Sequence, residues 1–74
     1  MIESEVRQAA EKLFVGQDLI GYTPVFLEAQ LGRVRPGQWT VLFEYRTAQG
    51  GVLDGPVVVV VDDKTGQAQL DPGP

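Results

Sequence analysis

The sequence predicts an α+β fold in which one amino-terminal helix packs on an antiparallel meander of three or four β-strands. Apolar residues recur at helical spacing up to residue 15, and from residue 25 onward they alternate with polar ones. Short segments of Gly, Pro and Asp separate the alternating stretches, and such connections join antiparallel neighbours. The chain has 74 residues, so we expect a single domain over residues 1–74, with a frayed tail at 71–74.

Residues 5–15 are predicted to form the helix. Ser4 precedes it as the expected N-cap, whose side-chain oxygen would accept a hydrogen bond from the first turn. Gly16 follows it as the expected C′ residue, because glycine adopts a positive φ at little cost. The apolar stripe expected to face the sheet consists of Val6, Ala9, Ala10, Leu13 and Phe14.

Three stretches, residues 25–31, 39–46 and 57–61, are predicted to form strands. Alternation places their odd-numbered residues against the helix and their even-numbered residues on the opposite face. The helix-facing set is Val25, Leu27, Ala29, Leu31, Trp39, Val41, Phe43, Tyr45, Val57, Val59 and Val61. The opposite set is Phe26, Glu28, Gln30, Thr40, Leu42, Glu44, Arg46, Val58 and Val60.

Turn-forming residues separate these strands. Residues 35–38 suit a type II turn, with Pro36 at its second position and Gly37 at the position that requires a positive φ. Residues 48–51 are expected to close a second hairpin. The third strand is expected to begin near Val52, to be interrupted at residues 54–56 because Pro56 lacks an N–H for the ladder, and to continue through the five valines. Residues 63–66 form a further turn, and residues 67–70 are expected to add a short edge strand.

Composition and charge exclude several classes of function. Six Lys and Arg against ten Asp and Glu give a net charge of −4, which argues against binding to nucleic acid. The chain contains no Cys and no His, so disulfides, Cys/His zinc sites and imidazole catalysis are excluded. The longest apolar run is five valines, far short of the roughly 20 residues that span a membrane. The acidic amino terminus does not resemble a signal peptide. We therefore expect a cytoplasmic protein with no cofactor.

Two acidic pairs have the composition of functional sites. Asp62 and Asp63 could attract a cation, but a calcium loop needs oxygen ligands at alternate positions, so a strand-ending turn is favoured. Glu28 and Glu44 could share acid–base chemistry, yet Arg33 and Arg46 are expected to neutralise them.

Two other residues suit structural roles better than functional ones. Trp39 fits core packing better than ligand recognition, and Asp54 is expected to be a turn residue. Since no nucleophile accompanies any of these groups, we expect no enzyme.

The valine stretch points instead to a contact surface. A half-exposed strand alternates apolar with polar residues, whereas residues 57–61 are apolar on both sides. A helix about 10 Å wide shields roughly two strands spaced about 4.8 Å apart. Cover for Val58 and Val60 is therefore expected from the 16–24 connection, from a second copy of the chain or from another protein. The predicted interface consists of Phe26, Leu42, Val58 and Val60, with Thr40, Glu44 and Arg46 at its margin.

Most of the chain, from the amino-terminal helix to Gly66, resembles two kinds of small cystatin-like domain. Val60, Val61 and Asp62, followed by Thr65 and Gly66, resemble the valine-rich strand and turn of PepSY domains, with Ala68 where that family usually has Val or Ile. The Trp39–Phe43 strand and the segment from Gly55-Pro56 to Gly66 look similar to small immunity-like domains of the YrhB kind. Both resemblances imply a binding or inhibitory module, and neither brings catalytic residues.

The sequence thus predicts a non-enzymatic protein-interaction module that acts through the face opposite the helix or by forming a homodimer. One alternative is a small-molecule-binding domain with a helix–sheet cavity lined by Phe14, Trp39 and Tyr45. A second alternative is an enzyme that uses Glu28, Glu44 or Asp54.

Overall fold

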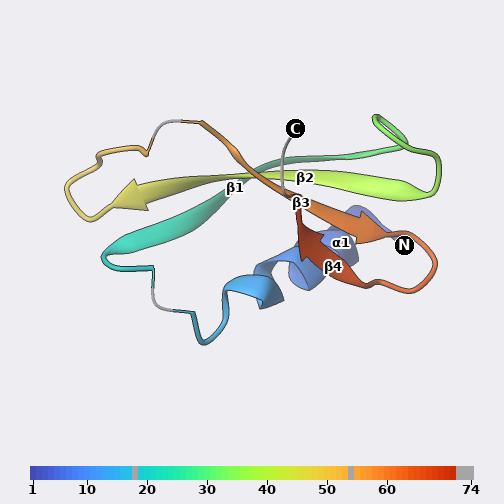
Figure 1. Ribbon diagram of the computed structural model, residues 1–74, viewed down its shortest axis with the longest axis horizontal. Helices are drawn as coiled ribbons and strands as arrows, with labels where there is room; N and C mark the ends of the chain where they lie inside the picture. The colour runs from blue at the N-terminus through green and yellow to red at the C-terminus, as the bar shows by residue number, and fades with distance from the viewer. Residues whose placement is uncertain (18, 54, 72–74) are drawn as a thin grey trace.

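A computed structural model of the chain describes residues 1–17, 19–53 and 55–71. A four-stranded antiparallel sheet in the order β1-β2-β3-β4 carries the helix α1 on one side (Figure 1). The α+β meander is therefore confirmed, with the fourth strand present. The elements are α1 (Glu3–Glu11), the 3₁₀ turn η1 (Lys12–Phe14), β1 (Tyr22–Leu31), β2 (Gln38–Thr47), β3 (Val57–Asp62) and β4 (Ala68–Leu70).

The helix begins earlier than expected and is capped differently. Ile2 occupies the N-cap position, and its backbone N–H donates to Glu5 Oε1 at 3.0 Å. Ser4 lies inside the first turn, so its expected capping role is wrong. The Glu5 carboxylate takes that role because a long acidic side chain at the third helical position reaches back to the chain entering the helix.

The helical stripe forms the centre of the core, as predicted. Phe14 packs edge-on against Phe43 and Tyr45, with ring centroids 5.0 and 6.0 Å apart. Contacts from α1 reach all four strands, so the expectation that one helix shields only two strands is wrong. Twist in a sheet turns strands at both edges toward a single helix. The buried apolar residues are Val6, Ala10, Phe14, Val41, Phe43, Val59 and Val61.

Strand β1 contains a bulge that the regular alternation did not predict. Its pairing with β2 is continuous as far as Phe26, which lies opposite Phe43, and it resumes with Glu28 opposite Leu42. Leu27 is thus an extra residue without a partner of its own. A bulge of this kind shifts the face on which the preceding residues lie.

The bulge places Phe26 on the helix side of the sheet. Its ring packs against Phe43 at 6.0 Å between centroids, and the Arg7 guanidinium lies 4.7 Å from the ring centroid on its outer side. The predicted position of Phe26 in the opposite face is therefore wrong. Val25 pairs with Glu44, and paired residues share a face, so the predicted helix-facing position of Val25 is wrong as well.

The predicted turns are confirmed. Gly37 has a φ of +75°, and Gln38 N–H donates to the Arg35 carbonyl at 3.3 Å, as a type II turn requires. The Gly50 N–H donates to the Thr47 carbonyl at 3.0 Å and closes the second hairpin.

The third strand is interrupted as expected. Val52 forms an isolated bridge with Arg46, and β3 begins only at Val57. The prediction for Asp54, and those for residues 72–74 of the tail, lie outside the described residues. Asp71 is tied to the sheet, since its N–H donates to the Val58 carbonyl at 2.9 Å. Within the described part of the chain, neither helical segment has the length and apolarity needed to cross a membrane.

Candidate functional site

The side of the sheet opposite α1, called here the open face, carries most of the predicted interface. The even-numbered β2 residues lie on it, because the odd-numbered Trp39, Val41, Phe43 and Tyr45 pack in the helix-side core. Leu42 and Val58 lie directly opposite each other on neighbouring strands, and both are half-buried. Predicted residues found on this face are Thr40, Leu42, Glu44, Arg46, Val58 and Val60. Phe26 is the one that does not belong to it.

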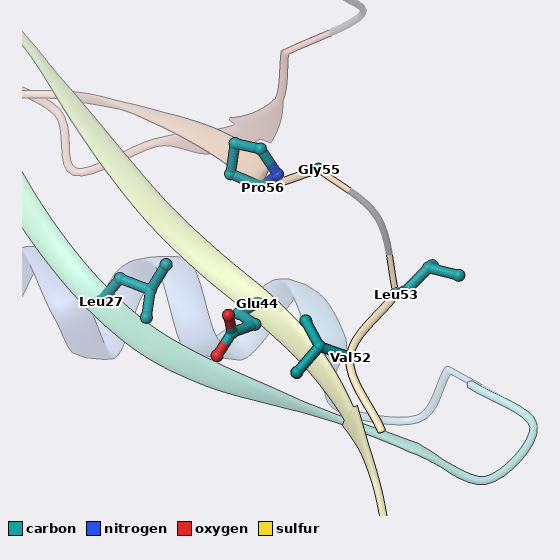
Figure 2. Close-up of a pocket in the computed structure, with 6 residues that line it drawn as sticks. All are labelled: Leu27, Glu44, Val52, Leu53, Gly55 and Pro56. Atoms are coloured by element: carbon teal, nitrogen blue, oxygen red, sulfur yellow. The ribbon is translucent and has the colours of Figure 1, made fainter. Parts of the chain in front are cut away.

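A shallow groove lies at the end of the open face where β1 and β2 extend toward the second hairpin. It has a volume of about 220 Å³. In Figure 2 the Glu44 carboxylate lies between Leu27 and Val52. The lining residues are Leu27, Glu44, Val52, Leu53, Gly55 and Pro56.

Two irregularities of the sheet create this groove. The bulge turns Leu27 out of the ladder on the β1 side. On the other side of β2, the break before Pro56 leaves Val52 and Leu53 outside the regular pairing of β3. Bulges and broken strands re-aim side chains in this way, and they recur beside functional sites. Leu27, Val52 and Leu53 remain 44%, 53% and 44% exposed, respectively.

Two glutamates of the open face form ion pairs with arginines. Arg46 contacts Glu44 Oε2 through Nε at 2.6 Å and through Nη2 at 2.5 Å. Arg33 Nη1 lies 3.6 Å from Glu28 Oε1. The predicted neutralisation of the two glutamates is confirmed. Each of these two glutamates thus has a basic partner.

The other end of the open face is polar. A second hollow of about 170 Å³ is lined by Gln38, Val60, Asp62, Gln67 and Gln69. Beside it, Thr40 is only 8% exposed, and its Oγ1 has no hydrogen-bond partner among the described residues. A buried hydroxyl without a partner costs about 1–3 kcal/mol, so this position is not optimised for the stability of the single chain.

The two adjacent aspartates have structural roles. Asp62 Oδ1 accepts the backbone N–H groups of Lys64 at 2.8 Å and Thr65 at 2.9 Å. These bonds, chiefly the one from Thr65, lower the pKa of Asp62. Together they hold the turn that was predicted in preference to a cation site.

Asp63 links the same turn to Trp39. Its Oδ1 accepts the Trp39 indole N–H at 2.7 Å and the Met1 ammonium group at 3.0 Å. The bond from Trp39, followed by that from the amino terminus, lowers the pKa of Asp63. Trp39 is half-buried against the core, so its predicted packing role is confirmed.

The alternative site between helix and sheet is occupied by the protein itself. Of its predicted lining residues, Phe14 is 9% exposed and stands between Phe43 and Tyr45 in two edge-on ring contacts. Trp39 and Tyr45 pack against the same core cluster. These side chains therefore fill the space in which a ligand was expected to bind.

The predicted cover from the 16–24 connection does not reach the open face in the described residues. Leu19 packs against the helix-side core, and Tyr22 pairs with Thr47 at the start of β1. Of the three kinds of cover predicted for Val58 and Val60, a second copy and another protein remain.

Five groove residues were not predicted from the sequence: Leu27, Val52, Leu53, Gly55 and Pro56. The break at residues 54–56 was a usable signal, because a bend there turns the adjacent residues out of the ladder. The bulge gave no such signal, since Val25, Phe26 and Leu27 are all apolar and no glycine marks the irregularity.

No family model, curated protein or solved structure matches this chain. The resemblance to PepSY and YrhB-type domains therefore stays a prediction.

Proposed function

We propose that this chain is a non-enzymatic protein-interaction module whose contact surface is the open face, and that a second copy of the chain is its partner. One observation carries the proposal. Apolar side chains on this face adjoin one another, and no segment among the described residues covers them: Leu42 and Val58 are half-buried at its centre, and Leu27, Val52 and Leu53 are exposed around the groove. Apolar patches of this kind mark interaction sites on small proteins.

The strand edges are poorer contact surfaces than the open face. β1 is an edge strand, but Pro24 lacks an N–H and the bulge at Leu27 breaks its pairing pattern. The opposite edge, β4, has only three residues. Proline, bulges and short strands are devices that block pairing between edges. Association through the face is therefore favoured over association through an edge.

Two quantities bear on association with a second copy, namely the charge of the chain and the area of its surface. The net charge of −4 opposes self-association in general, but on the open face Glu44 is paired with Arg46 and Glu28 with Arg33. A standard interface buries about 800 Å² per partner, roughly one-sixth of the 5120 Å² surface of the chain. A dimer formed through the open face would have to cover that share of the surface.

The resemblance to immunity-like and PepSY domains supports this proposal, because it implies a binding or inhibitory module. Such a module acts by contact with a protein surface, with no chemical step. A cytoplasmic location belongs to the same proposal, since a chain without Cys suits a reducing compartment.

Light scattering over a range of concentrations tests the proposal. The wild-type chain is expected to approach twice the 8.1 kDa mass of one copy, and Val58→Asp is expected to remain at the single mass. Val34→Asp is the matched control, because Val34 is 70% exposed on the turn between β1 and β2. Circular dichroism should show the same helix signal in all three proteins. A Val58→Asp chain that keeps the wild-type mass would refute the open face as the contact surface.

A further inference from the structure

We draw no further inference here: the strongest candidate, the polar hollow of the open face lined by Gln38, Val60, Asp62, Gln67 and Gln69, carries nothing, because its carboxylate already accepts the backbone N–H groups of Lys64 and Thr65 and nothing in the described residues shows what covers it.

Discussion

The two faces of the sheet differ in how they are built, although the same strands form both. Next to α1, Val41, Phe43, Val59 and Val61 are fully buried. On the open face, Leu42 and Val58 are half-buried, and Thr40 has a buried hydroxyl without a partner among the described residues. The helix-side face is packed for stability. The open face has half-buried apolar side chains and a buried hydroxyl without a partner among the described residues, which contribute less to the stability of one chain.

The bulge in β1 and the break before β3 change the composition of both faces. The bulge at Leu27 brings Phe26 into the core and moves Leu27 out of it. The break before β3 adds Val52 and Pro56 to the open face. The helix-side face gains a ring contact from the bulge, and the open face gains a groove.

The largest expected difference between the two faces is in the free energy of unfolding after substitution of neighbouring valines of β3. Val59→Ala should lower the free energy of unfolding by about 2 kcal/mol, because it removes methyl groups from a fully buried site. Val58→Ala should cost less than about 1 kcal/mol, because that side chain is half-buried. Urea unfolding at a concentration where the chain is monomeric measures both. Equal losses would mean that the two faces are packed alike.

Substitution of Thr40 tests whether its buried hydroxyl lowers the stability of the folded chain. Thr40→Val replaces a buried hydroxyl with a methyl group of similar size, so we expect the free energy of unfolding to rise by about 1 kcal/mol. Thr23→Val is the control, because Thr23 is exposed, and its effect should stay within about 0.5 kcal/mol. A loss of stability in Thr40→Val would show that the hydroxyl is hydrogen-bonded.

Deletion of Leu27 tests the bulge directly. Phe26 opposite Phe43 and Glu28 opposite Leu42 become consecutive pairs when the extra residue is removed. No residue then changes face, so stability should change by less than about 1 kcal/mol while the groove loses one wall. Urea unfolding and the dimer dissociation constant measure the two effects. An unfolded deletion variant would contradict the register described above.

The smallest effect concerns the turn after β3, where acid should weaken the fold. The pKa values of Asp62 and Asp63 lie below their ordinary 3.8 in the folded chain. The unfolded chain therefore binds protons more readily than the folded chain. The two carboxylates stabilise the folded chain above pH 3.8, and this stabilisation is lost as the pH falls through the lowered pKa values. Urea unfolding between pH 5 and pH 3 should show this decline, and Asp63→Asn should show a shallower one. An equally steep decline in Asp63→Asn would exclude a contribution from Asp63.

Much of the fold could be predicted from the sequence because its signals are local. The helical stripe, the Pro36-Gly37 turn and the break at Pro56 each follow from residue types at fixed spacing. The capping of the helix could not be predicted in this way. Ser4 is the better capping residue by type, but the observed bond at this end runs from the Ile2 N–H to the Glu5 carboxylate.

The candidate site was predicted only in part because its composition depends on register. Strict alternation correctly placed Leu42, Val58 and Val60. It misplaced Phe26, because no local residue signals the bulge and only packing against Phe43 decides which residue faces the core. The groove lies between the bulge in β1 and the break before β3. These two segments are distant in the sequence, and they come near each other because both β1 and β3 pair with β2.

Solvent accessibility of individual methyl groups tests the central claim, that the open face is a contact surface, most directly. Methyl signals are followed by NMR in the presence of a soluble paramagnetic probe while the protein concentration is raised. Leu42, Leu53 and Val58 should become shielded from the probe, whereas Val15 and Val34, which are 78% and 70% exposed elsewhere, should stay accessible. Open-face methyl groups that remain as accessible as Val15 and Val34 at the highest concentration would contradict it.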